Sequence, residues 1–329
     1  MFCLPAILDQ IELTDNNYCP LNNTGFYDID YDLIPLQDNS PYCPHTREIC
    51  ETTITNIDKT NIQIPTFLPT DSALWLDADD SSTITTVSGA VSEWRDKSSN
   101  NRHATQTTAS NRPLLVGNGL NGTDVIRFDG SDWMDCLTSL TLTSQHLFTI
   151  FKYNSNSGGF ARVFTYSDNG LDFNNTGHYI PILRNSGGNS LFSFFSGGFN
   201  SGLSMTNEEI VLWENLHTGS NVSNYKNGRS ISSAVSNNNL NKTFTRYRIA
   251  GALDGATNNN LNGDISQIIL FPRVLTQTER EEMEGYMAWN SGVQGNLPSN
   301  HPYKNSYPGV IVTSATVCTD FYEFSNPPS

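Results

Sequence analysis

The middle of the chain consists of short segments in which apolar and polar residues alternate, each followed by residues that favour tight turns. About a dozen such segments at this spacing indicate a β-sandwich or barrel, because βαβ units would need a helix between successive strands. Asn227-Gly228 separates two of them and is the strongest short-range signal for a β-hairpin. The expected strands cover residues 73–77, 91–96, 124–128, 146–151, 161–166, 179–184, 191–195, 210–217, 222–226, 247–251 and 265–271.

One helix is expected directly after the last of these strands. Thr276 and Glu279 fit a capping box, in which each side chain accepts a hydrogen bond from the other residue's backbone N–H. Met283, Tyr286 and Met287 fall on one helix face and should pack against the sheet. The predicted fold class is therefore all-β, an antiparallel jelly-roll β-sandwich with one short C-terminal helix, flanked by extended N- and C-terminal arms.

Charge argues against two classes of partner. The chain has 18 Lys and Arg against 33 Asp and Glu, a formal net charge of −15. Nucleic-acid phosphates and anionic membranes both attract basic surfaces, so neither partner is expected. No apolar run reaches the roughly 18 residues that a membrane-spanning helix needs.

Three regions are expected along the chain. Residues 71–292 hold the sandwich, and residues 293–329 form a C-terminal tail. Residues 1–70 contain many prolines and no sustained strand or helix period. Because such a segment cannot build a large core of its own, it is expected to be an extended arm that anchors the chain to neighbouring subunits.

The beginning of the chain carries two further signals. Cys43 and Cys50 are close enough to form a disulfide, with free thiols or half of a zinc site as the alternatives. Residues 1–5 lack the basic segment that opens an ordinary secretory signal. Either the mature chain begins here, or the protein leaves its cell by another route, such as inside a virus particle.

Several of these segments resemble a known family. The opening half of the resemblance consists of residues 73–78, 91–98, 103–106, 112–113 and 125–130, and the closing half of 225–228, 263–265, 275–276, 284–289, 297–298 and 301–304. In this order they resemble a laminin-G-like domain of the concanavalin A-like lectin/glucanase superfamily. The segments resemble the type of laminin-G-like domain that occurs in phage and large-virus structural proteins and in marine bacterial surface proteins.

The resemblance covers residues 71–304 and implies two antiparallel sheets in a jelly-roll sandwich. It also implies that His103 and His301 make hydrogen bonds within turns. It does not imply one activity, because members include sugar binders, adhesion modules and structural virion parts.

Catalysis is not expected. Enzymes of this superfamily use closely spaced acids on one strand, typically in a Glu-x-Asp-x-x-Glu pattern, as nucleophile and general acid. The nearest candidates are Glu208, Glu209 and Glu214. Glu209 should oppose both other side chains, and Glu208 and Glu214 share a face but lie too far apart along the strand. No catalytic residue is therefore predicted.

Four aspartates are candidates for a metal site. Asp77 and Asp79, and likewise Asp129 and Asp132, could offer clustered oxygen ligands to Ca²⁺. The alternative is that these aspartates end strands and cap turns. A calcium site would be the only cofactor expected.

Aromatic residues near loops are candidates for sugar binding. Trp133 stands in a turn-rich segment, and Tyr153 and Tyr179 flank Gly- and Asn-rich loops. Exposed aromatic rings at such places could stack on a glycan.

These features predict a non-enzymatic virion protein that displays the sandwich for capsid decoration or for tail or fibre attachment to a host-surface glycan. Its partners would be other virion subunits, bound through the arm in an oligomeric assembly. The first alternative is a secreted or cell-surface glycan-binding module of a microbe. The second is a glycoside hydrolase or lyase.

Overall fold

The computed structural model describes residues 71–155, 159–168, 178–184, 190–195, 198–200, 204–231, 235–236, 240–253 and 259–308. The expected arm with Cys43 and Cys50, and the tail beyond residue 308, lie outside the described residues. The described residues belong to one compact unit, Phe67–Pro308. They form an antiparallel β-sandwich that carries a single α-helix in the described ranges, so the predicted fold class is confirmed.

The first layer of the sandwich has the strand order β1-β20-β9-β14-β15, with every neighbouring pair antiparallel. Strand β15 continues through a tight turn into β16 and also pairs with β17. The strands of this layer are β1 (Leu74–Asp77), β20 (Asn262–Phe271), β9 (Gln145–Tyr153), β14 (Val211–His217), β15 (Asn221–Lys226), β16 (Arg229–Ser230) and β17 (Val235–Ser236).

The second layer has the strand order β4-β7-β19-β10-β11-β12-β13, again antiparallel throughout. Its strands are β4 (Ala104–Thr105), β7 (Met134–Cys136), β19 (Arg246–Ile249), β10 (Arg162–Ser167), β11 (His178–Arg184), β12 (Leu191–Phe195) and β13 (Gly198–Asn200).

Strand β20 joins the two layers into one hydrogen-bonded system. One of its edges pairs with β9, whereas the other pairs first with β6 and then with β1. From β6 the pairing continues through β5 and β3 to β4, and β2 pairs with β3. The remaining elements are β2 (Ile84–Val87), β3 (Ala90–Trp94), β5 (Leu114–Leu120), β6 (Thr123–Asp129), β8 (Leu140–Leu142), β18 (Lys242–Phe244) and the 3-10 helices η3 (Ser81–Thr83), η4 (Ala109–Asn111) and η6 (Gln294–Asn296).

Apolar side chains fill both faces of the first layer. In β9, Leu147 and Phe151 belong to the core between the layers, whereas Phe148 and Ile150 belong to a second core on the outer face. Residues 268–271 of β20 alternate between the same two cores. The uninterrupted apolar run at the end of this strand follows from its burial on both sides, since neighbouring side chains of a strand point to opposite faces.

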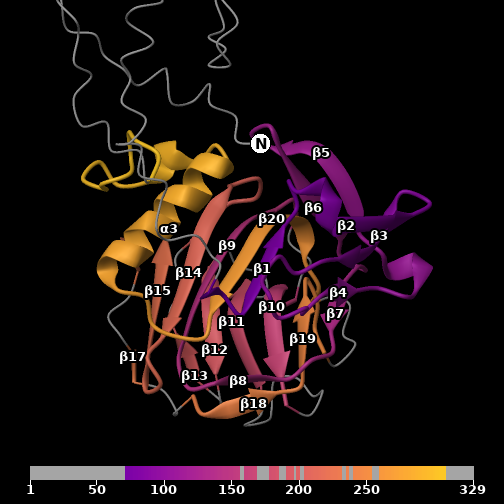
Figure 1. The fold of residues 1–329 in the computed structure, drawn as a ribbon, viewed down its shortest axis with the longest axis horizontal. Helices are drawn as coiled ribbons and strands as arrows, with labels where there is room; N and C mark the ends of the chain where they lie inside the picture. Colours follow the sequence, from indigo (N-terminus) through magenta and orange to yellow (C-terminus); the bar gives the residue numbers. More distant parts are fainter. Residues whose placement is uncertain are drawn as a thin grey trace, which may run out of the picture. The chain divides into compact units, whose positions relative to one another are not determined.

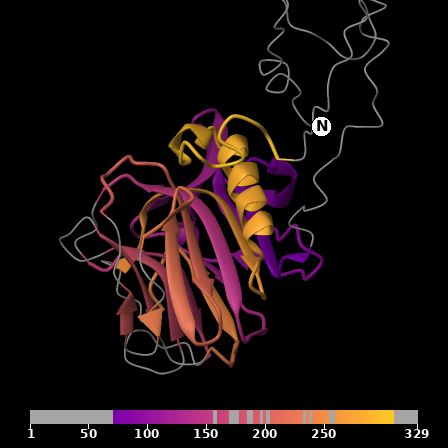
Figure 2. The ribbon, with the colours of Figure 1, turned by 90° about the vertical axis from the view of Figure 1, so that its left-hand side faces the viewer.

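Helix α3 (Gln277–Asn290) covers the outer face of the first layer (Figures 1 and 2). The predicted capping box is present: Thr276 Oγ1 accepts from the Glu279 backbone N–H at 3.3 Å, and the Glu279 carboxylate accepts from the Thr276 N–H at 2.7 Å. Met283, Tyr286 and Met287 pack on the sheet as predicted.

The chain continues to pack against the helix after α3 ends. Val293 and Leu297 belong to the same outer core, and the Trp289 indole N–H donates to the Tyr303 carbonyl at 2.9 Å. The compact unit therefore extends past residue 292 to Pro308. None of the helices in the described ranges has the length and apolar character that crossing a membrane requires.

Candidate functional site

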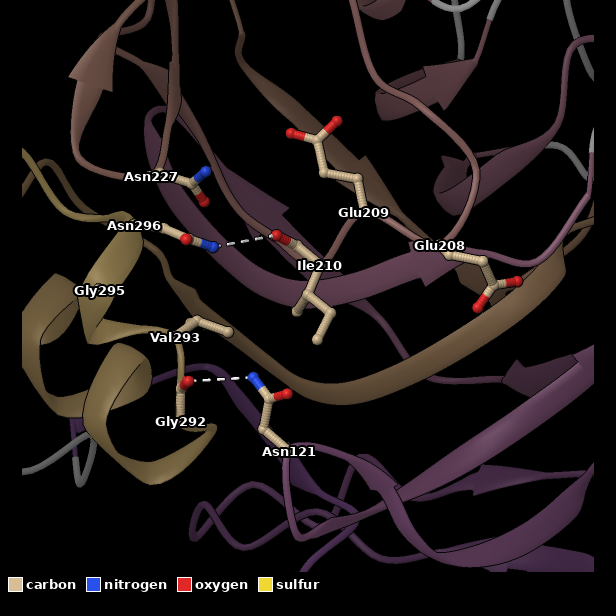
Figure 3. Close-up of a pocket in the computed structure, with 9 residues that line it drawn as sticks. All are labelled: Asn121, Glu208, Glu209, Ile210, Asn227, Gly292, Val293, Gly295 and Asn296. Atoms are coloured by element: carbon tan, nitrogen blue, oxygen red, sulfur yellow. Dashed lines mark hydrogen bonds between the residues drawn. The ribbon is translucent and has the colours of Figure 1, made fainter.

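A polar pocket lies beside the end of helix α3 (Figure 3). Its volume is about 420 Å³, within the range of roughly 300–1,000 Å³ that small-molecule sites occupy. We call it the Asn227 pocket. It is lined by Asn121, Glu208, Glu209, Ile210, Asn227, Gly292, Val293, Gly295 and Asn296.

The hairpin between β15 and β16 forms one wall of the pocket. Asn227 and Gly228 have φ angles of +52° and +72°, the type I′ geometry that Asn-Gly favours and that the sequence predicts. The Asn227 backbone N–H donates to the Leu212 carbonyl at 2.7 Å, and its side-chain Oδ1 accepts from the Leu212 N–H at 2.9 Å. These two bonds hold the hairpin tip against β14.

A second wall forms where the β5–β6 turn meets the end of the helix. The Asn121 side-chain amide donates to the Gly292 carbonyl at 3.0 Å. Gly292 has a φ of +63°, and a Cβ placed on it would lie 2.9 Å from the Asn121 Cβ. Glycine at this position therefore permits both the left-handed backbone and the close approach of the two segments.

Two glutamates stand at the edge of the pocket, and each is neutralised by a lysine. Lys152 Nζ lies 2.6 Å from a Glu208 oxygen, and Lys226 Nζ lies 2.5 Å from a Glu209 oxygen. The two carboxylates point away from each other (Figure 3). The predicted divergence is present, but its cause is different: Glu208 has a φ of +63° and lies in the turn before β14, so strand alternation does not set the directions of these two side chains.

The interior of the pocket combines amides with apolar groups. The Asn296 amide donates to the Ile210 carbonyl at 3.5 Å, and the Ile210 and Val293 side chains lie between the polar groups (Figure 3). Such a lining can hydrogen-bond hydroxyl groups and also contact C–H groups. Of these residues, only Glu208 and Glu209 and the Asn-Gly turn were noted from the sequence. The others belong to segments far apart in the chain, and no spacing rule connects them.

Asp77 and Asp79, proposed as calcium ligands, are bound to groups of the protein. Lys97 Nζ lies 2.9 Å from Asp77 Oδ2 and 2.9 Å from Asp80 Oδ2. Asp79 Oδ1 accepts from the Asp124 backbone N–H at 3.0 Å. The lysine ammonium thus takes the place between two carboxylates that a cation would need.

Asp129 and Asp132 cap a turn, which is the alternative to a calcium site. Asp129 Oδ1 accepts from the Ser131 N–H and hydroxyl, both at 2.7 Å, and Asp132 Oδ2 accepts from the Asp129 N–H at 3.1 Å. Burial raises the pKa of Asp132 to about 7. In the part of the chain that the structure describes, no group of three or more His, Cys, Asp or Glu side chains could hold a metal ion.

The structure does not bring the three proposed sugar-stacking aromatics together on an exposed surface. Tyr153 and Tyr179 are 0% exposed, because they point inward from β9 and β11 into the core between the layers. The Tyr153 hydroxyl donates to the Ala161 carbonyl at 3.0 Å. Trp133 is half-buried, with the Arg248 guanidinium 4.8 Å from its ring centre. Of the three rings, only the Trp133 ring remains partly accessible.

A cluster of ionisable groups is buried beneath helix α3. Glu284 and Glu214 are 0% exposed. The Arg280 guanidinium bonds to Glu284, and one of its nitrogens lies 3.9 Å from Glu214 Oε2. His301 Nε2 lies 2.7 Å from Glu284 Oε2, and His146 Nε2 lies 3.5 Å from Glu214 Oε2. We call these five residues the α3 cluster.

Burial dominates the protonation states in the α3 cluster. Burial and the nearby Glu284 carboxylate raise the pKa of Glu214 well above its usual value. Burial and the charges of Arg280 and Arg273 lower the pKa of His146 to about 3. His146 is therefore neutral near pH 7, and burial favours the protonated form of Glu214.

No protein-family model matches the chain, and no curated protein sequence matches it. Among solved structures, the chain is similar to a Trypanosoma rangeli sialidase in complex with sialic acid, with 11% identity and a TM-score of 0.49 over 74% of this chain and 38% of that one. The binding domain of Paraclostridial Mosquitocidal Protein 1 has 13% identity and a TM-score of 0.48, over 67% of this chain and 53% of that one.

A third similar structure is domain 4 of AbnA, a GH43 extracellular arabinanase from Geobacillus stearothermophilus, in complex with arabinotriose. It has 10% identity and a TM-score of 0.46, over 64% of this chain and 96% of that one. The chain spans only 38% and 53% of the first two structures. Because all these scores and identities are low, the similarities assign neither an activity nor a ligand to the chain.

Proposed function

We propose that the chain is a non-enzymatic carbohydrate-binding β-sandwich and that the Asn227 pocket holds a sugar unit. The observation that carries the proposal is the composition of the pocket: three asparagines and two lysine-paired glutamates surround the side chains of Ile210 and Val293. A sugar unit has the same two characters, hydroxyl groups around its rim and C–H groups on its faces.

The charges around the pocket favour a neutral sugar. Lys152 and Lys226 compensate Glu208 and Glu209, so the pocket offers no excess positive charge to an acidic sugar. The asparagine amides can both donate and accept, which suits hydroxyl groups.

The directions of the carboxylates support a binding role over a catalytic one. Glycoside hydrolysis needs two carboxyl groups that face the same bond, about 5 to 9.5 Å apart. Glu208 and Glu209 diverge (Figure 3), and each is held by its own lysine. Glu214, the third candidate, is 0% exposed under helix α3.

A glycan array followed by calorimetry on each hit tests the proposal. Asn296→Ala removes an exposed pocket amide and should weaken binding at least several-fold, since one hydrogen bond is worth about 1 kcal/mol. Asn300→Ala, in the same segment but outside the pocket lining, is the matched control and should bind like the unchanged protein. An array without any hit, or equal losses in both variants, would contradict the proposal. Release of reducing sugar from a bound glycan would favour the hydrolase alternative.

The virion role stays a prediction that depends on the arm, which lies outside the described residues. The virion role requires that the full chain associates with other particle subunits. Native mass spectrometry of the full chain, compared with a chain that begins at residue 67, would test whether residues 1–66 mediate association.

A further inference from the structure

The α3 cluster contains two buried carboxyl groups but one fixed positive charge. Glu214 comes from β14 and Glu284 from α3, and Arg280 is the cation beside both. Two ionised carboxylates at this site would leave one negative charge uncompensated in the protein interior, which is strongly unfavourable.

Glu214 also lacks a fixed hydrogen-bond donor. Among the described residues, neither of its carboxyl oxygens accepts a hydrogen bond from a backbone or side-chain group. The nearest imidazole, that of His146, also has both ring nitrogens without a hydrogen-bond partner in the described part of the chain. A proton on Glu214 removes the uncompensated charge, as in other cases where two carboxyl groups lie near one cation.

The groups facing Glu214 come from every element packed around it. His146 projects from β9, and Tyr225 of β15 lies with its ring centre 4.6 Å from the Arg280 guanidinium carbon. Helix α3 contributes Arg280, Glu284 and, at the rim, Glu281, which is 3.9 Å from Arg280. The segment after the helix contributes His301 through Glu284. Among these groups, Arg280 is the only one that is positively charged at every working pH.

The α3 cluster reaches the hairpin beside the Asn227 pocket through His301. A Cβ placed on Gly228 would lie 3.3 Å from the His301 ring, 3.2 Å from Pro298 and 3.3 Å from Leu297. Gly228 is the residue after Asn227 in the hairpin that forms the pocket wall. His301 therefore contacts the pocket hairpin on one side and bonds Glu284 on the other.

We infer that a proton on Glu214 controls the Asn227 pocket, because its loss places a second negative charge near Glu284 and displaces His301, and with it the hairpin at Gly228. Below the midpoint of this titration the cluster is balanced and the pocket wall is held. Above it, a second buried negative charge pushes β14 and the segment after α3 apart. This pH control rests on the proposed function, because only a pocket that binds a ligand makes use of it.

The response can be measured without a ligand. In ¹⁵N-labelled protein, the Gly228 amide reports the pocket wall, and the Trp289 indole N–H, bonded to the Tyr303 carbonyl, reports the docking of the segment after α3. Both resonances should shift between about pH 5 and 9 with one common midpoint. The ¹³C resonance of the Glu214 carboxyl should titrate with the same midpoint, well above the ordinary glutamate value. Gly228 and Trp289 resonances that stay constant over this range would overturn the inference.

Two variants separate the steps. Glu214→Gln mimics the neutral carboxyl and should abolish both shifts, whereas Glu93→Gln, on β3 and outside both the pocket lining and the α3 cluster, should leave both unchanged. His301→Gln removes the ring that lies between Gly228 and Glu284, so both shifts should be lost while the Glu214 carboxyl still titrates. Shifts that persist in Glu214→Gln would contradict the inference. If this variant does not fold, the Glu214 carboxyl resonance of the unchanged protein decides the question.

Binding measurements distinguish the two proposals. If a glycan binds, its affinity should fall about fivefold or more from below to above the midpoint, and this fall should disappear in Glu214→Gln. Gly228 shifts without any glycan binding would refute the proposed function and leave the pH control intact. Glycan binding with a constant Gly228 resonance would support the proposed function and refute the pH control.

Discussion

His301 Nε2 lies 2.7 Å from Glu284 Oε2, so the segment after helix α3 is tied to the buried face of that helix. The other ring nitrogen, Nδ1, accepts from the Tyr303 backbone N–H at 3.1 Å, which is the turn hydrogen bond implied by the family resemblance. One imidazole thus closes a turn and satisfies a buried carboxylate at the same time.

Replacing His301 should destabilise the fold. His301→Ala leaves the buried Glu284 oxygen without its partner, and we expect a loss of about 2 kcal/mol in the free energy of unfolding, measured with urea. His103→Ala is the control, since the half-buried His103 ring accepts a backbone N–H, from Asp96 at 3.0 Å, and bonds to no buried carboxylate in the described ranges. Equal losses in the two variants would show that the His301–Glu284 bond adds no measurable free energy of unfolding.

Acid should destabilise the protein through His217. Burial lowers the pKa of His217 to about 4, whereas an unfolded histidine titrates near 6.5. The unfolded state therefore binds more protons below pH 6.5, and stability falls as the pH drops toward 4, by up to about 1.4 kcal/mol per pH unit. Urea unfolding at several pH values should show a shallower fall for His217→Gln. Parallel curves for the two proteins would contradict this prediction.

A side chain at Gly263 should disrupt β20. A Cβ there would lie 2.1 Å from the Lys152 carbonyl oxygen, so Gly263→Ala forces β20 and β9 apart and should cost about 3 kcal/mol or more in unfolding free energy. Gly295→Ala is the control, because a Cβ at that position meets nothing within 4 Å. The thermal midpoint should fall only in the first variant. An unchanged thermal midpoint in Gly263→Ala would show that β20 and β9 lie farther apart at Gly263 than the structure indicates.

The space around Gly295 also allows the pocket to be filled. Gly295→Phe should block glycan binding and leave the thermal midpoint unchanged within error, because Gly295 lines the pocket and a Cβ there meets nothing within 4 Å. Asn300→Phe adds the same ring outside the pocket lining and should bind normally. Retained binding by Gly295→Phe would place the sugar site elsewhere.

The capping box should contribute measurably to the helix. Thr276→Ala removes the acceptor of the Glu279 N–H, and a loss of about 1 kcal/mol in unfolding free energy is expected. Thr278→Ala, in the exposed first turn, should be neutral or slightly stabilising, since alanine favours helices. A larger loss in Thr278→Ala than in Thr276→Ala would contradict the role of the cap.

The sequence allowed the secondary structure to be predicted where one local rule decides it. The Asn227-Gly228 turn follows from the positive φ that these two residues tolerate, and the helix start follows from the capping pair Thr276 and Glu279. Most strands agree within a few residues. Short strands such as β2 and β7 were missed, because four or three residues carry too little alternation to be recognised.

The face to which an aromatic residue points was harder to predict. Tyr153 and Tyr179 stand beside loops in the sequence, yet both rings are buried. A position near a loop does not say which side of the sheet a ring occupies, since one step along a strand reverses its direction.

The sandwich, its hairpin turn and its capped helix can be predicted from the amino-acid sequence, because alternation, turn residues and caps act between near neighbours in the chain. The Asn227 pocket and the α3 cluster depend on how distant segments pack together. Glu214, Glu284 and His301 come from a strand, a helix and the segment after it, and meet because helix α3 covers the outer face of β14. The protonation of a buried carboxyl depends on neighbours in space, and no pattern along the chain contains that information.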